Sequence, residues 1–165
     1  METLFATLHV VAAVFIVGPL AILPMTAMRA IRAGQGQQVD VLARSTFLLS
    51  LLSLLVVIFG FGILGFSTHG TTITTGWVLS SLILYVIALG LSLFGVVPAL
   101  RTAAAQLTGA GAGSGSTAGA AAGVAAGAAA GAADGVAAAR RRVAMFSGIT
   151  SLLLVVIVVL MTWKP

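Results

Sequence analysis

The hydrophobic residues of this chain fall into four long unbroken stretches, and shorter polar segments between them carry nearly all of the charges. The stretches run from Thr3 to Met28, from Thr46 to Phe66, from Trp77 to Leu100 and from Val143 to Trp163, and none contains an interior Asp, Glu, Lys or Arg. Each supplies the ~20 apolar residues that cross a hydrocarbon core about 30 Å thick. Only helices and closed barrels satisfy their backbone groups there, and continuous apolar runs lack the alternation of barrel strands. The pattern predicts an all-α protein, a four-helix transmembrane bundle.

Composition excludes the other broad classes of protein. Of the 165 residues 60% are hydrophobic and 7% are charged, and the mean hydropathy is +1.21. A soluble globular domain carries about 25% charged residues, and a disordered chain is poor in apolar ones. The chain has no cysteine, which excludes disulfides, thiolate metal sites and a cysteine nucleophile. We therefore expect the lipid bilayer to be its main surroundings.

The basic residues predict how the bundle is oriented. Seven of the eight lie in the first and third polar segments, which share one side of the membrane: Arg29, Arg32, Arg44, Arg101, Arg140, Arg141 and Arg142. The positive-inside rule makes that side cytoplasmic and places both termini outside. Basic residues interleaved with aromatic ones, as nucleic-acid binding needs, are missing, so no nucleic-acid partner is predicted.

Small residues indicate where the helices contact one another. Lipid tails are as apolar as leucine, so helices in a bilayer associate through close packing and a few hydrogen bonds. Small side chains recur on one face or cluster in three of the stretches, and we expect them to be packing positions: Gly60, Gly62, Gly65, Ala88, Ser92 and Gly148. Tyr85 is too deep for an interfacial aromatic belt and is expected between helices. Pro98 is expected to end the third helix, whereas Pro19 bends the first.

The segment from Ala103 to Ala139 is low in complexity and consists mainly of alanine and glycine. Its plain interpretation is a flexible cytoplasmic loop. Glycines recur within it every four residues, at Gly115, Gly119, Gly123, Gly127, Gly131 and Gly135. On a helix this spacing makes a smooth stripe suited to close packing, but each interior glycine costs about 1 kcal/mol relative to alanine. We expect loose or partly helical structure, with a docked helix as the alternative.

Two histidines are the candidate ligands for a cofactor. His9 lies in the first stretch and His69 in the second polar segment, both near the predicted outer side. A pair of imidazoles can ligate haem iron, or a soft metal if a third ligand joins them. In the alternative interpretation His69 is solvated and His9 bonds a neighbouring helix, within an outer polar cluster drawn from Ser67, Thr68, His69, Thr162 and Lys164. No carboxylate lies in a stretch, so no catalytic residue is predicted.

Parts of the chain resemble known membrane proteins. The opening Phe5-Ala6-Thr7-Leu8-His9, the Pro98/Arg101 region and the closing Leu160–Pro165 are similar to a bacterial family of four-helix integral membrane proteins, domain of unknown function 2269. This resemblance covers about residues 3–101 and 140–165 and implies a bacterial cytoplasmic (inner) membrane location. The first helix also resembles the copper-resistance D-type membrane domain and the four-helix protoporphyrinogen oxidase. Those groups have a Trp where Phe15 or Ile16 stands here, and a Gly in place of Pro19.

The leading functional expectation is a non-catalytic accessory or scaffolding subunit of a larger membrane complex, such as a respiratory one. It needs no cofactor, and its partners are lipid and other membrane-protein subunits. The alternatives are a haem-binding or redox-active membrane protein that uses His9, and a small copper-handling transporter. The transporter ranks last because the chain shows neither an inverted repeat nor a pair of broken helices.

Overall fold

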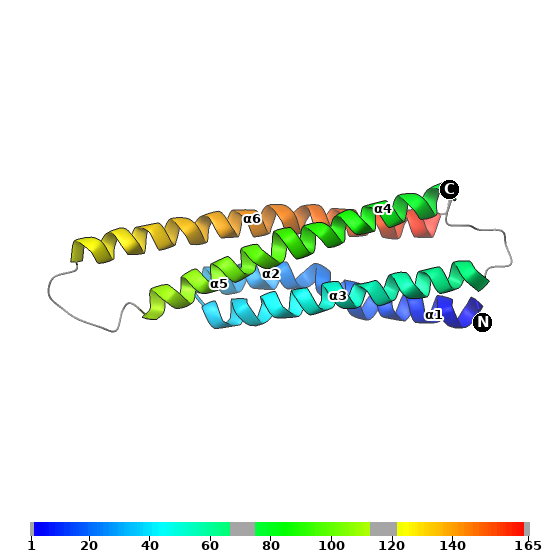
Figure 1. Ribbon diagram of the computed structural model, residues 1–165, viewed down its shortest axis with the longest axis horizontal. Coiled ribbons are helices and arrows are strands. Elements are labelled where there is room, and N and C mark those ends of the chain that lie inside the picture. Colours follow the sequence, from blue (N-terminus) through cyan, green and yellow to red (C-terminus); the bar gives the residue numbers. More distant parts are fainter. Residues whose placement is uncertain (1, 67–74, 113–121, 164–165) are drawn as a thin grey trace.

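The computed structural model describes residues 2–66, 75–112 and 122–163, which are helical apart from a short turn and a helix cap. In chain order the elements are α1 (Glu2–Ala12), the π-helical turn η1 (Ala13–Val17), α2 (Gly18–Arg32), α3 (Gly36–Phe66), α4 (Gly76–Gly90), the π-helical turn η2 (Leu91–Val96), α5 (Val97–Ala112) and α6 (Ala122–Trp163). The π-turns join α1 to α2 and α4 to α5, so the described chain forms four long rods (Figure 1).

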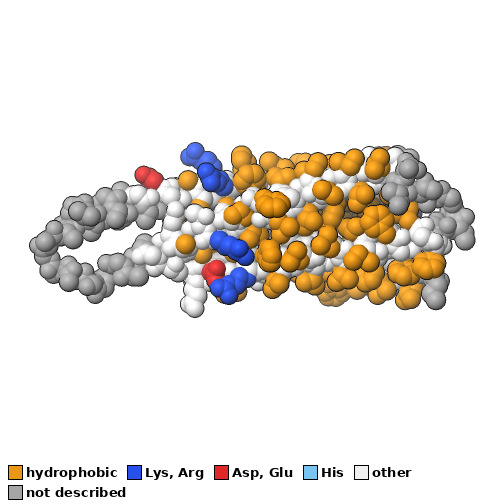
Figure 2. Space-filling model, viewed as in Figure 1, with side chains coloured by type: hydrophobic (Ala, Val, Ile, Leu, Met, Phe, Trp, Pro, Cys, Tyr) orange, Lys and Arg blue, Asp and Glu red, His pale blue; other side chains and the backbone are white. Residues whose placement is uncertain are grey.

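The all-α architecture expected from the hydrophobic pattern is confirmed for the described residues. They contain four helical segments long and apolar enough to cross a membrane: Thr3–Arg32, Gly36–Phe66, Gly76–Gly109 and Ala133–Trp163. The chain is therefore treated as a multi-pass membrane protein. The start of α1 and the end of α6 lie together at one end of the bundle (Figure 1). The arginine side chains gather towards the other end, beside a broad band of hydrophobic side chains (Figure 2). We call the first end the terminal end and the second the arginine end.

The second rod is longer than predicted, because α3 begins at Gly36 and not at Thr46. The segment that was expected to be a polar loop is amphipathic. Val39 and Ala43, four residues apart, are both completely buried and share one helix face with Thr46. Packing of this face against the other helices stabilises a helical extension that hydropathy alone does not reveal.

The connection between α2 and α3 is a tight turn. Gly34 adopts a left-handed conformation with φ of 70°, which a glycine reaches without the clash that a Cβ causes. Its N–H donates to the carbonyl of Ile31 at 3.2 Å, and the N–H of Gln35 donates to the carbonyl of Ala30 at 3.0 Å. This pair of bonds is the Schellman pattern for ending a helix, and it turns the chain back so that α3 runs antiparallel to α2.

Pro98 does not end the third rod, contrary to expectation. The preceding turn η2 is π-helical, and its last bond runs from the N–H of Val97 to the carbonyl of Ser92. Gly18 closes η1 in the same way, directly before Pro19. Proline has no N–H and its ring collides with the preceding turn of an α-helix. A wider π-turn relieves that collision, so each proline becomes the second residue of the α-helix that follows.

The Ala/Gly segment is not a loop where the structure describes it. Residues 103–112 belong to α5 and residues 122–139 to α6, whereas Gly115 and Gly119 lie outside the described residues. Gly135 packs against the side chain of Gln106 on α5, and Ala139 is buried. The part of the glycine repeat nearest the membrane is therefore a docked helix, the alternative that the sequence left open.

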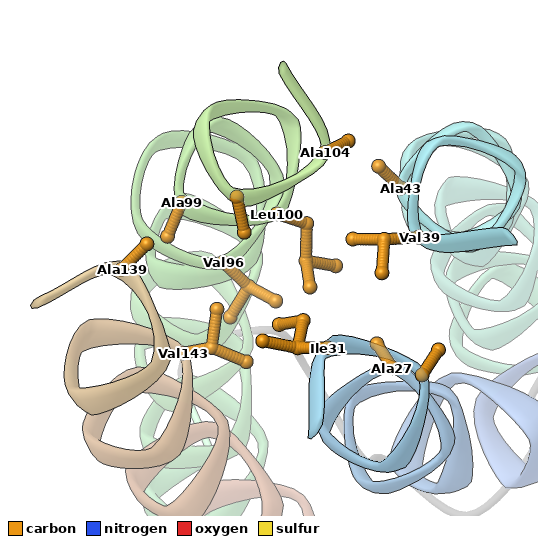
Figure 3. Close-up of a cluster of buried hydrophobic side chains, with 12 residues drawn as sticks. Ala27, Ile31, Val39, Ala43, Val96, Ala99, Leu100, Ala104, Ala139 and Val143 are labelled. Atoms are coloured by element: carbon orange, nitrogen blue, oxygen red, sulfur yellow. The ribbon is translucent and has the colours of Figure 1, made fainter. Parts of the chain in front are cut away.

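The main hydrophobic core lies near the arginine end and joins all four rods. It consists of Ala27, Ala30, Ile31, Val39, Ala43, Val96, Ala99, Leu100, Ala103, Ala104, Ala139 and Val143. Figure 3 shows Ile31, Leu100 and Val143 converging from α2, α5 and α6. Several of these residues directly neighbour an arginine in the sequence, so the core extends to the level where water is present. Burial of apolar surface from water contributes to stability there, which it does not between helices surrounded by lipid.

The rods separate into two pairs towards the terminal end. There α1 packs against α3 and α4 packs against α6, while the extensive contacts between the pairs are made by α5 with α3 and by α2 with α6. The two pairs are visible at the terminal end in Figure 1. The bundle is thus closed at the arginine end and divided at the terminal end.

Candidate functional site

His9 is half-buried on α1 and bonds to the backbone of α3. Its Nδ1 lies 2.7 Å from the carbonyl oxygen of Val56. Because a carbonyl only accepts, Nδ1 is the donor in this bond. Gly60 makes the approach possible, since a Cβ there would lie 3.2 Å from Cε1 and 3.3 Å from Nδ1 of the imidazole. This is the bond to a neighbouring helix that the structural alternative for His9 expects.

The outer polar cluster expected around His9 is not formed by the described residues. Thr162 is exposed and donates to the carbonyl of Val158 in its own helix, at 2.8 Å. Ser67, Thr68, His69 and Lys164 lie outside the described residues. Within the described ranges no group of three or more His, Cys, Asp or Glu side chains is placed to hold a metal ion. The structure thus describes one of the two histidines expected to act as ligands.

The α1–α3 pair is held together by aromatic side chains lying on glycines. The ring of Phe5 covers Gly62 so closely that a Cβ at this glycine would collide with it. The same ring stacks on Phe66, with 5.3 Å between the ring centroids and 17° between the planes. Gly60 and Gly62 therefore lie in helix contacts, where the sequence places them.

The other small residues divide into partnered and unpartnered positions. Ala88 is buried. Gly95 is a packing position that the sequence did not predict. The ring of Phe146 lies against it, so that a Cβ at residue 95 would be only 2.9 Å from the ring. Gly65 and Gly148 are exposed. A Cβ at either glycine would have open space around it, with no contact within 4 Å in the described part of the chain. The expectation that these two glycines pack inside the bundle is not met by the described residues.

Hydroxyl groups meet where the two helix pairs join. Ser50 on α3 shares a 2.8 Å hydrogen bond with Ser92 of η2, and Ser53 shares one of 2.7 Å with the phenol of Tyr85 on α4. Ser92 and Tyr85 thus lie between helices, as expected. Thr150 on α6 belongs to the same region, and its Oγ1 is buried without a hydrogen-bond partner among the described residues. We call these five residues the hydroxyl cluster. Sequence reasoning did not single out Thr150, although a polar residue in step with Val143 signals a position facing the bundle.

A small cavity lies within the hydroxyl cluster. Its volume is about 10 Å³. The polar lining residues are Ser53, Tyr85, Ser92 and Thr150, and the remainder are Ala, Val or Leu. Thr150 is eight residues from Arg142, which corresponds to roughly 12 Å along a helix. The cavity is therefore close to the middle of a hydrocarbon core ~30 Å thick.

The arginines at the arginine end are all exposed. Arg44 forms an ion pair of 2.9 Å with Asp40, one turn earlier on α3. The guanidinium carbon of Arg101 lies 5.5 Å from the ring centroid of Phe47, a cation–π contact that ties α5 to α3. The side chains thus lie at the boundary of the apolar band, where the sequence places them.

Among the described residues of the four hydrophobic stretches, the polar side-chain groups are hydroxyls, one imidazole and the indole N–H groups of Trp77 and Trp163. Most of the hydroxyls bond within their own helix, and three bonds in the described part of the chain join different helices: His9–Val56, Ser50–Ser92 and Ser53–Tyr85. Comparisons with known protein families, curated proteins and solved structures found no match to this chain.

Proposed function

We propose that the protein is an accessory or scaffolding subunit of a larger membrane complex, without catalytic chemistry of its own. Its helices bind lipid on most of their surface and a helix of another membrane protein on α6. The arginine end faces the cytoplasm and both termini face outward, because basic residues accumulate on the cytoplasmic side. The resemblance of the chain to a family of bacterial integral membrane proteins favours the bacterial cytoplasmic membrane.

Gly148 on α6 is the observation that carries this proposal. Gly60, Gly62 and Gly95 each receive a ring from another helix of the chain. Gly148, in contrast, is exposed and has open space around it in the described structure, and Ala144 one turn earlier is exposed as well. Two small residues four apart on a lipid-facing surface let a second helix approach closely. This face of α6 has the form of a helix contact and lacks a helix from its own chain.

The test replaces Gly148 with leucine and compares the result with Gly90→Leu. Gly90 also has open space around it, but large exposed side chains flank it one turn away on both sides, Val86 and Phe94, whereas Gly148 has Ala144 on one side and Leu152 on the other. Val86 and Phe94 keep another helix at a distance, so a leucine at residue 90 changes little. Tagged wild-type protein and the two variants would be purified from native membranes in a mild detergent, and co-purifying proteins identified by mass spectrometry.

We expect wild type and Gly90→Leu to elute in an assembly larger than the 16.5 kDa chain, with the same membrane proteins attached. Gly148→Leu should lose those proteins while remaining inserted. Elution of the wild type alone, at its own mass, would refute the scaffolding function. Retention of all partners by Gly148→Leu would refute the assignment of the contact to this face of α6.

Haem or metal binding at His9 is a second candidate, favoured by the orientation of the imidazole. Histidines that bind a metal usually donate their other ring N–H to a carbonyl or a carboxylate, which fixes the ring and raises its basicity. The bond from Nδ1 of His9 to Val56 does this and directs the lone pair to Nε2. A haem iron or a copper ion would bind there, with His69 as the expected second ligand.

The visible spectrum of the purified protein tests this candidate. A Soret band in the wild type that disappears in His9→Ala but persists in Thr7→Ala, an exposed position two residues earlier, is the expected result. Absence of a Soret band before and after addition of haem, together with absence of bound copper, would refute it.

A further inference from the structure

Thr150 has a buried hydroxyl group that forms no hydrogen bond with the described part of the chain. The side chain is only 8% exposed, and its Oγ1 has no hydrogen-bond partner in the described part of the structure. Other threonines in these helices donate to a carbonyl of their own helix, as Thr46 does to Leu42 at 2.8 Å. A buried polar group without a partner is destabilising, and such groups are rare in folded proteins.

The cavity beside Thr150 has the size and the lining of a water site. A cavity holds one water molecule when its volume reaches roughly 10–15 Å³, and the volume of this one, about 10 Å³, lies at the lower end of that range. A buried water also needs two to four polar partners. The lining supplies the hydroxyls of Ser53, Tyr85 and Ser92 in addition to Thr150.

The same lining argues against other occupants. It contains no Asp, Glu or His, and hard cations such as Ca²⁺ and Mg²⁺ are usually bound through carboxylates. A larger molecule has no room. Both π-turns border the cavity, through Val17 of η1 and Ser92 of η2, and π-turns are frequent at functional positions of helices.

We propose that this cavity binds one ordered water molecule, which accepts or donates a hydrogen bond at Thr150 and bridges it to the hydroxyls of Tyr85 and its neighbours. The water connects α6 to α4 and α3 at the level where the two helix pairs join. Among the described residues the direct bonds Ser50–Ser92 and Ser53–Tyr85 do not involve α6, and the water adds α6 to this hydrogen-bonded group.

Thr150→Val tests the proposal, because valine has nearly the shape of threonine without its hydroxyl. If the hydroxyl is bonded to water, the variant should unfold at a lower temperature, by about 2–4 °C or more for a chain of this size. If the cavity is dry, the variant removes an unpaired polar group and should unfold at the same or a higher temperature, which would overturn the proposal. The full chain would be measured in detergent.

Two further measurements keep the outcome interpretable. Thr46→Val is the matched control, because its hydroxyl is buried but bonded within its own helix; the unfolding temperature should fall less than in Thr150→Val. Combining Thr150→Val with Tyr85→Phe should give a smaller drop than the sum of the single drops, since both remove partners of one water. Additive drops, or an experimental density map with no peak within about 3.2 Å of Thr150 Oγ1, would overturn the proposal.

Discussion

The substitution Leu100→Ala tests whether burial of apolar surface from water stabilises the core near the arginine end, as it does in a soluble protein. The side chain is completely buried and lies among Val39, Val96 and Ile31 from three different elements (Figure 3). Replacing it with alanine removes three carbon atoms and leaves a cavity between helices that approach through short side chains. Those helices are long and continuous, so they have little freedom to move in and fill the space.

The expected loss of stability can be estimated from these features. Three buried carbon groups at about 0.8 kcal/mol each give ~2.4 kcal/mol. The unfilled cavity raises the total to roughly 3–4 kcal/mol, within the usual range for leucine in a core. For a chain of this length 1 kcal/mol shifts the unfolding temperature by about 2–4 °C. Leu100→Ala should therefore lower that temperature by about 6–16 °C.

Thermal unfolding of the purified protein in a mild detergent, followed by size-exclusion chromatography of the remaining fold, measures this shift. Leu48→Ala on α3 is the control, because Leu48 is 56% exposed and lies away from the proposed partner face of α6, so its side chain is surrounded by lipid or detergent. Its unfolding temperature should change by no more than about 2 °C. Equal shifts in the two variants would refute the view that the main core lies at the arginine end.

Three further experiments address other contacts. His9→Ala should lower stability by about 1–2 kcal/mol in chemical denaturation, through loss of the bond to the α3 backbone; an unchanged midpoint would contradict the geometry. Ser50→Ala and Ser92→Ala should be coupled by about 0.6 kcal/mol in a double-mutant cycle, the average for such bonds in a membrane, and strict additivity would exclude the bond. Gly34→Val should lower the unfolding temperature by several degrees, because a side chain at positive φ costs roughly 1–2 kcal/mol; an unshifted curve would argue against the turn.

The four spans could be predicted from sequence because each is recognised by the combined hydropathy of about 20 residues. No single residue decides it, so the prediction tolerates Pro19, Pro98 and the scattered glycines. The ends of the helices could not be predicted in this way. Helix α3 begins at Gly36 in polar sequence, where the buried Val39 and Ala43 compensate for low hydropathy. Helix α6 begins at Ala122 in Ala/Gly-rich sequence, where hydropathy gives no signal.

The candidate site was predictable only in part, because the sequence identifies polar residues within a membrane span but not the groups to which they bond. His9, Tyr85 and Ser92 stood out because an apolar helix has to bond such groups elsewhere. Their partners did not, because a carbonyl such as that of Val56 has no sequence signature. Thr150 was overlooked since threonine commonly bonds its own helix, and only the arrangement of the neighbouring helices shows that it does not.

The division of the bundle into two helix pairs has a consequence for biosynthesis. Each pair consists of rods that follow one another in the chain, so α1 and α3 can associate before the ribosome has made α4. The core near the arginine end is different, because it needs Ala139 and Val143 from the last helix. Until that helix is inserted, the face that it covers, which includes Val96 of η2 and Ala99 of α5 (Figure 3), stays unprotected at the membrane surface. An incomplete chain thus displays the apolar surface that chaperones and membrane proteases recognise, and only the finished chain covers it.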